Sequence, residues 1–493
     1  MFAQIAAIGG RVSPVQYTVE SIPSVTPQTL AVGRMLFGSL LLFFLLDLPA
    51  DFVMRLATAG PMYPITRFLD QTGLLSALSA NPSFASLFLM VTAGLLVAFI
   101  LGAATVVVYP LLVMAFWLLA FLGNQGHFIT PLLLALTATL GAPWSAAWSI
   151  DSLFRSQAVP QQTSRLFGYP LWLLGLTIGL TYMSAGLSKL ILTDGAWLWD
   201  TGARNGLLQD LDKALSDIGM VISNNYLLSL IASVLSSFGQ IIYVYSSFTR
   251  SPAIKYAICF LVALPFLIGL ALTMGLFWWP WGILVLMLYL PWQSIDNFIA
   301  RRLPSPPAHD QDFIEGRHFA WFMTATAGLI GIHLFAILSR SEWEPVYSNY
   351  PMYADRMRAG SEYEAEFWNR FTPHDRHFRP VIHLVAADNT AQDVSYQNRL
   401  ARFWDYARVY RSSYLGLQPF VVLRSASSGQ PIPPDTCRAI IKSVAAVSSV
   451  PVTQVRYAKH YFDLKNGRVE WLPVSDSSWI SVQLEQGCRY RQQ

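Results

Sequence analysis

Stretches of mainly apolar residues follow one another from about residue 29 to residue 339. A helix of roughly 20 apolar residues crosses the hydrocarbon core of a bilayer, so nine such stretches predict nine membrane-spanning helices. The fourth is the weakest candidate, because Pro131 and Pro143 interrupt it. The stretches are residues 29–49, 83–102, 104–123, 128–147, 169–191, 226–247, 253–273, 275–293 and 319–339.

The pattern changes after Ser341, where apolar residues alternate or recur at helical spacing. We expect a small α+β domain with an antiparallel sheet, and Asn466-Gly467 between two apolar runs is typical of a hairpin turn. Strands are predicted over Val381–Ala387, Phe420–Leu423 and Val455–Leu464. Helices are predicted over Glu362–Phe371, over Tyr396–Tyr410 and from Pro434 to about Val447.

Composition agrees with a membrane protein. Of the 493 residues, 54% are hydrophobic and only 13% are charged, whereas a soluble protein carries about 25% charged residues. The net charge of +4 is small and dispersed, which argues against a nucleic-acid partner. The predicted fold is mainly α: a cytoplasmic segment at 1–28, a polytopic helix bundle at 29–340, and a small α+β domain at 341–493. The first 28 residues lack an apolar core segment, so we expect the first helix to serve as an uncleaved insertion signal.

Basic residues orient the bundle by the positive-inside rule. With a cytoplasmic N-terminus, the inner loops hold Arg155, Arg165, Arg250, Lys255, Arg301, Arg302 and Arg317. The outer loops hold Arg55, Arg67, Lys189, Arg204 and Lys213, spread over longer segments and mixed with acids. An odd number of spans then makes the C-terminal domain extracytoplasmic.

The chain has three cysteines. Cys259 falls within a predicted span, and Cys437 and Cys488 fall in the C-terminal domain. A pair outside the cytoplasm can form a disulfide, and we favour a bridge between Cys437 and Cys488 over two separate thiols.

Lys189 stands at the end of the fifth apolar stretch, and His127 lies between the third and fourth stretches, at the same predicted depth on the outer side. An amine held against apolar surface becomes available as a base, and a histidine can move protons near neutral pH. The alternative is that Lys189 extends its amine to the membrane surface and His127 ends a helix. A metal site is not predicted, since His374, His377 and His383 share no face with a carboxylate.

The run Tyr182-Met183-Ser184-Ala185-Gly186-Leu187-Ser188-Lys189-Leu190 resembles the Y-x-x-A-G-x-x-K-L run of the vitamin K-dependent gamma-carboxylase and its bacterial relatives, the horizontally transferred transmembrane (HTTM) family. Trp197 after it, Asn124 to His127, Trp148 to Asp151, and Arg34 in the first span are also similar to the family's pattern. The resemblance covers roughly residues 28 to 300.

The resemblance implies an enzyme of the bacterial cell membrane that uses reduced vitamin K or menaquinone at the outer face to modify a secreted or membrane-associated peptide. It implies that Lys189 is the base that deprotonates the hydroquinone and that His127 assists. Cofactor binding would involve Arg34, Asn124, Tyr182 and Trp197. The C-terminal domain is far shorter than the carboxylase's, and Gln125 and Gly126 separate Asn124 from His127, so a quinone-dependent role is expected more than glutamate carboxylation.

Two other functions stay open at this point. The chain could be a non-catalytic membrane partner or maturation factor that binds a secreted protein through the domain after Ser341. A transporter is the least favoured, because the apolar stretches contain few charges and no evident inverted repeat.

Overall fold

The computed structural model describes residues 14–48, 52–61, 64–123, 126, 128–154, 163–199, 202–209, 214–274, 279–302, 316–339, 378–394, 419–448, 450–465, 468–475, 478–484 and 487–491. The chain forms two compact units. The first, here called the helical unit, comprises residues 1–192, 237–265 and 279–352, and the second comprises residues 193–236, 266–278 and 353–493.

Seven helices are long and apolar enough to cross a membrane, counted over the described residues. They are α3 (Pro27–Asp47), α7 (Pro82–Leu101), α8 (Thr105–Leu122), α11 (Arg165–Leu192), α15 and α16 together (Tyr226–Phe248), α17 to α18 (Pro252–Met274), and α21 (Gly316–Ser339). An eighth candidate is the pair α19 (Trp279–Tyr289) and α20 (Trp292–Ala300), which is bent by 60° at the break that contains Pro291.

Nine membrane-length helices are therefore not confirmed. The segment predicted as the fourth span forms only the nine-residue helix α9 (Thr130–Ala138), and turns and irregular backbone follow it to Ser149. Pro131 sits at the start of α9, where its missing N–H costs nothing. Pro143 lies in the irregular stretch, where a continued helix would have to accommodate its ring.

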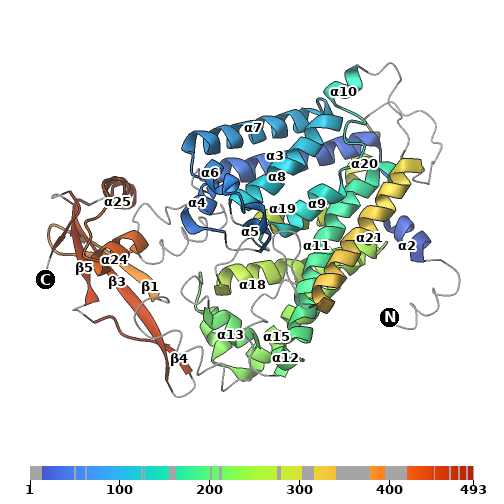
Figure 1. Ribbon diagram of the computed structural model, residues 1–493. Helices are drawn as coiled ribbons and strands as arrows, with labels where there is room; N and C mark the ends of the chain where they lie inside the picture. The colour runs from blue at the N-terminus through green and yellow to red at the C-terminus, as the bar shows by residue number, and fades with distance from the viewer. Residues whose placement is uncertain are drawn as a thin grey trace. The chain divides into compact units, whose positions relative to one another are not determined.

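Helix α11 is the central element of the helical unit, and most of its residues are buried. It packs against α3, α9, α19 and α21, and it runs beside α21 in Figure 1. Glycines permit these close contacts: a Cβ at Gly33 would lie 2.4 Å from Leu171, and one at Gly175 would lie 2.8 Å from Leu288.

Several contacts join helix ends at one end of the helical unit. Val25 and Ser164, just before α3 and α11, form an antiparallel bridge. The Asp296 carboxylate of α20 accepts hydrogen bonds from the Thr26 backbone N–H (2.7 Å) and the Thr29 hydroxyl (2.5 Å) at the start of α3. Asp151 accepts from the backbone N–H groups of Ala104 and Thr105, where α8 begins. We call this the α11-start end.

The C-terminal part of the second unit contains an antiparallel sheet in the order β2-β1-β3-β5-β6, with β4 paired to β3. The strands are β1 (Phe378–Ala386), β2 (Ala391–Asp393), β3 (Val452–Lys465), β4 (Arg468–Trp471), β5 (Ile480–Gln483) and β6 (Arg489–Arg491). Helices α24 (Pro419–Ser427) and α25 (Pro434–Val447) complete its hydrophobic core, and α24 lies against β1 and β3 (Figure 1).

The antiparallel sheet, its first and third strands and the helix from Pro434 to Val447 are confirmed. The strand predicted over Phe420–Leu423 is wrong, because these residues lie in α24. A short apolar run fits either structure by periodicity, and here Val422 and Leu423 are buried from a helix. The helices predicted over Glu362–Phe371 and Tyr396–Tyr410, and the turn Asn466-Gly467, lie outside the described residues.

Cys437 of α25 and Cys488, before β6, form a disulfide with a Cα–Cα distance of 5.6 Å. This is the pairing that the sequence favoured. Both cysteines belong to the core between the sheet and the helices, so the bridge fixes α25 to the sheet's end.

Candidate functional site

Lys189 lies near the C-terminal end of α11 and is only 3% exposed. Its ammonium donates a hydrogen bond to Oε1 of Gln240 on α15, at 2.6 Å, and Gln240 is fully buried. Gly186, one turn before Lys189, allows α15 to come close, since a Cβ there would lie 2.5 Å from the Ser237 carbonyl oxygen. Gly186 therefore brings Gln240 within reach of Lys189.

An aromatic cluster adjoins this pair; it is formed by Tyr182 of α11, Tyr243 directly after α15, and Trp281 and Tyr289 of α19. The rings of Tyr182 and Tyr243 stack with centroids 4.2 Å apart. Trp281 meets Tyr182 edge-on at 5.2 Å, and Tyr289 meets Tyr243 edge-on at 6.4 Å. Tyr182 precedes Lys189 by two helical turns, and Tyr243 follows Gln240 by about one turn. The Lys189–Gln240 pair and the stacked tyrosine rings therefore share the α11–α15 interface.

Two buried donors in this interface have no hydrogen-bond partner among the described residues. They are the side-chain nitrogen of Gln240 and the hydroxyl of Tyr243. A buried polar group without a partner costs about 1–3 kcal/mol, and here two of them lie in the interface that also holds the buried Lys189. Such donors are suited to meet the oxygen atoms of a ligand.

His333 on α21 is a further titratable residue inside the helical unit, and it is buried. Its Nδ1 lies 2.7 Å from the Leu329 carbonyl, and its Nε2 lies 3.4 Å from the Thr181 hydroxyl of α11. Sequence reasoning missed it, although a histidine within an apolar stretch is a signal for function. It also missed Gln240, whose amide is the only one in the run Ser237-Phe238-Gly239-Gln240-Ile241.

The structure does not bring Arg34 to Lys189. Gly33 packs on Leu171 near the start of α11, and Lys189 lies 18 residues further along, about 27 Å at 1.5 Å per residue. Arg34 is fully buried and donates to the carbonyls of Trp144 (2.6 Å) and Trp148 (2.5 Å) in the irregular stretch after α9.

The described hydrogen bonds of Arg34 therefore all go to backbone carbonyls. Arg34 also donates to the carbonyls of Ile100 and Ala147. Gly102, with φ of +68°, leaves room for it, because a Cβ there would lie 2.7 Å from the guanidinium. The carbonyl groups of the irregular stretch lack the regular N–H partners that a helix provides. The guanidinium group of Arg34 donates to some of them instead.

Of the remaining predicted residues, Asn124 and His127 lie outside the described residues. Trp197, in α12 (Ala196–Trp199), is buried in the second unit and donates from Nε1 to the Ser236 hydroxyl at 3.3 Å. Among the predicted cofactor residues that the structure describes in the helical unit, Tyr182 shares an interface with Lys189 and Arg34 does not.

The residues around Lys189 combine aromatic rings with the unpartnered donors of Gln240 and Tyr243. These are the kinds of group that contact the ring and the oxygens of a quinone-type molecule, although Tyr182 and Tyr243 here stack on each other. Among the described residues, there is no group of three or more His, Cys, Asp or Glu side chains that could bind a metal ion.

Comparison of the chain with protein-family models, with curated proteins and with solved structures finds no match. The resemblance of the Tyr182–Leu190 run to the HTTM family therefore stays a prediction. What can be concluded about function comes from the residues and their arrangement.

Proposed function

We propose that this chain is an integral membrane protein in which Lys189 handles a proton of a reduced, quinone-type cofactor at the outer membrane face, in order to modify a secreted or membrane-associated peptide. The observation that carries the proposal is the buried contact of the Lys189 Nζ with Oε1 of Gln240 (2.6 Å). A lysine placed inside an apolar helix bundle is costly, and such residues usually serve proton or ligand chemistry. The resemblance to the HTTM family points to the same residue.

The residues of the chain would divide the work as follows. Lys189, as the free amine, accepts a proton at Nζ, and the Gln240 carbonyl accepts a charge-assisted hydrogen bond from the ammonium that forms. The Gln240 amide nitrogen and the Tyr243 hydroxyl would donate to ligand oxygens. A reduced quinone, when bound, would supply an acidic hydroxyl and two reducing equivalents. Burial excludes water, which strengthens each of these polar contacts.

We infer that the chain makes nine crossings, the fourth in broken form, from α9 and the irregular residues 139–149. In support, α3, α8 and α11 all begin at the α11-start end, as their contacts with one another and with Asp151 and Asp296 indicate. Helices α8 and α11 therefore run in the same direction, and the chain between them has to return. Irregular backbone at membrane depth is tolerated where protein buries it, and Arg34 satisfies part of it.

The last helix supports an extracytoplasmic C-terminal domain. Near the start of α21, Trp321 donates to the Ala138 carbonyl and His318 lies 3.2 Å from the Gly141 carbonyl. Tyr169, near the start of α11, donates to the same Gly141 carbonyl. Helix α21 thus begins near the α11-start end, and the domain that follows it would emerge on the opposite side, where a Cys437–Cys488 disulfide is chemically expected.

Topology reporters test this arrangement in the full chain. Alkaline phosphatase, which is active only outside the cytoplasm, should be active when fused after Gln493, and a green fluorescent protein fused there should stay dark after export. The reverse result would contradict nine crossings and favour eight.

Lipid analysis tests the proposed chemistry. Purified full-length protein, with added menaquinol, should retain the quinone, and Lys189→Ala should lose most of it while remaining monodisperse. Thr177→Val is a matched control, because Thr177 is a buried hydroxyl on the same helix that donates to the Leu173 carbonyl. Equal retention by wild type and Lys189→Ala would refute the assignment. Absence of quinone from the wild type would favour a partner protein that acts through its C-terminal domain.

A further inference from the structure

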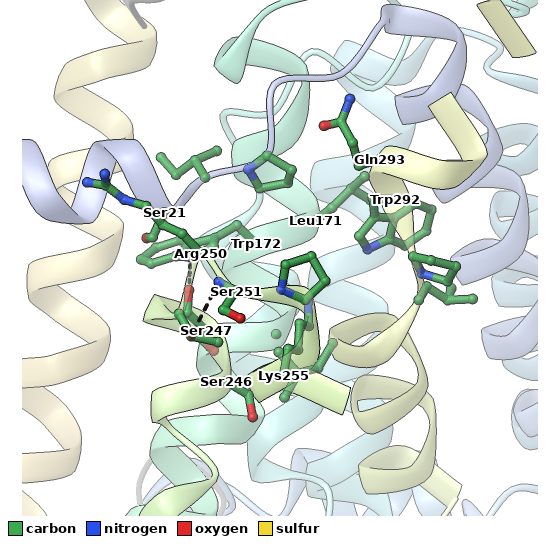
Figure 2. A pocket seen from close by; sticks show the side chains of 18 of the residues that line it. Ser21, Leu171, Trp172, Ser246, Ser247, Arg250, Ser251, Lys255, Trp292 and Gln293 are labelled. Atoms are coloured by element: carbon green, nitrogen blue, oxygen red, sulfur yellow. Dashed lines mark hydrogen bonds between the residues drawn. The ribbon is translucent and has the colours of Figure 1, made fainter. Parts of the chain in front are cut away.

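A cavity of about 380 Å³ lies at the α11-start end of the helical unit. Its walls come from the connection between α2 (Pro14–Ser21) and α3, the first turns of α11, the turn between α16 (Tyr245–Phe248) and α17 (Pro252–Ile258), and the bend between α19 and α20. Figure 2 shows labelled side chains from these elements around it. Lys189, Gln240 and the four residues of the aromatic cluster do not line it, although Ser246 in its wall hydrogen-bonds to Tyr289 of that cluster at 3.1 Å.

The cavity is apolar on one side and polar on the other. Leu171, Gly175 and Leu288 line it from helices that continue into the bundle. Hydroxyl groups line it near the α16–α17 turn, which connects two candidate spans and so lies at a membrane surface. Ser247 is 4% exposed, and its hydroxyl has no partner among the described residues. The cavity therefore suits an amphipathic molecule whose polar group accepts hydrogen bonds.

The charges that line the cavity do not cancel. Arg250 forms an ion pair with Glu20, whereas the side-chain ammonium of Lys255, which also lines the cavity, has no hydrogen-bond or ion-pair partner in the described parts of the chain. Arg250 and Lys255 against Glu20 leave one net positive charge. Trp172 and Trp292 also line the cavity, and tryptophan favours the headgroup region of a bilayer.

We propose that this cavity binds an anionic phospholipid, with its phosphate at Lys255 and the Ser247 hydroxyl and its glycerol or upper acyl portion against Leu171 and Leu288. A free phosphate ion shares the anionic chemistry, but the apolar side of the cavity would stay unused by it. Basic pockets between helices at the cytoplasmic surface suit anionic lipid headgroups, and the basic residues of the sequence assign this end of the bundle to the cytoplasm.

Native mass spectrometry of the full-length protein tests the proposal. Delipidated protein is titrated with phosphatidylglycerol, phosphatidylcholine or inorganic phosphate. Wild type should retain phosphatidylglycerol over phosphatidylcholine, and Lys255→Gln should weaken phosphatidylglycerol binding about fivefold, the loss expected for one cation near a lipid surface. Lys255→Arg should keep the binding, which provides a readout if Lys255→Gln fails to fold.

Arg301→Gln is the matched control, because Arg301 is exposed, carries the same charge and does not line the cavity. Its binding should equal that of the wild type. Unchanged binding in Lys255→Gln, or an equal loss in Arg301→Gln, would overturn the proposal. Displacement of phosphatidylglycerol by millimolar inorganic phosphate would overturn the lipid assignment in favour of a free-phosphate site.

Discussion

The Lys189 ammonium and the Gln240 side-chain carbonyl lie 2.6 Å apart, and they join two helices through side chains that are 51 positions apart in sequence. Both residues are buried. A short hydrogen bond from a cationic donor in such surroundings contributes more than one at the surface. The pair is therefore both a structural link between α11 and α15 and the polar centre of the proposed site.

Replacement of Gln240 tests both roles. Gln240→Leu should destabilise the protein by about 2–3 kcal/mol, because it removes the acceptor of a buried charged donor. Gln240→Glu keeps an acceptor at the same place and should unfold near the wild-type temperature. Thermal unfolding in detergent measures the difference. Equal midpoints for Gln240→Leu and wild type would show that Lys189 does not depend on this acceptor.

Replacement of Arg34 should damage folding and not only cofactor retention. Arg34→Met would leave the carbonyls of Trp144 and Trp148 without their donor, at about 1–3 kcal/mol for each unsatisfied group. Even Arg34→Lys should lower the unfolding temperature, since an ammonium cannot reproduce the guanidinium fork. Size-exclusion chromatography and thermal unfolding report the outcome. Arg67→Met, at an exposed position, should behave as wild type.

The Asp296 carboxylate accepts all of its described hydrogen bonds at one oxygen, from the Thr26 N–H and the hydroxyls of Thr26 and Thr29. Asp296→Asn keeps an oxygen there and should lower the unfolding temperature by less than Asp296→Ala. For the alanine variant we expect a loss of about 2 kcal/mol, because it removes the acceptor of three buried donors at the start of α3. Similar unfolding temperatures for the two variants would contradict this role.

Stability of the C-terminal domain should fall as the pH falls below about 6.5. Partial burial lowers the pKa of His383, with a smaller opposing contribution from Asp393 and a supporting one from Arg456. The unfolded chain then binds more protons than the folded chain between the two pKa values, so stability is lost as pH drops through the unfolded value. Limited proteolysis of the full chain between pH 7.5 and 5.5 should show this, and His383→Gln should weaken the dependence.

Removal of the disulfide should loosen the same domain. The bridge closes a loop between residues 51 apart, for which chain entropy predicts about 4 kcal/mol of stabilisation. The double variant Cys437→Ser/Cys488→Ser should therefore be cleaved faster by protease. Cys259→Ala, which alters a cysteine outside the bridge, should remain as resistant as wild type until reductant is added.

Lys189 could be predicted from the sequence because it is a single charged residue at the end of a long apolar stretch. Gln240 could not, because its partner lies on another helix and no local spacing encodes that contact. The site's aromatic rings were equally hidden: Tyr243, Trp281 and Tyr289 look like ordinary apolar or interfacial residues until the helices are packed together.

Hydrophobic averaging explains why one predicted strand is wrong and why the fourth span is not confirmed as a continuous helix. Over residues 128–147 the average is apolar enough for a span, but it does not register the break after Ala138 or the donors that Arg34 provides. The apolar run Phe420–Leu423 is too short for its periodicity to distinguish a strand from a helix. The longer segments Pro434–Val447 and β3 repeat their apolar residues often enough to predict a helix and a strand.

The contacts of Arg34 also constrain how the chain can be inserted. The stretch around Trp144 and Trp148 takes its donors from α3 rather than from its own helix, so it has no stable place in lipid until α3 is present. Because α3 is synthesised before this stretch, Arg34 is already present when the carbonyls of Trp144 and Trp148 need their donors. A chain shortened from its N-terminus past Arg34 would thus be a substrate for membrane proteases.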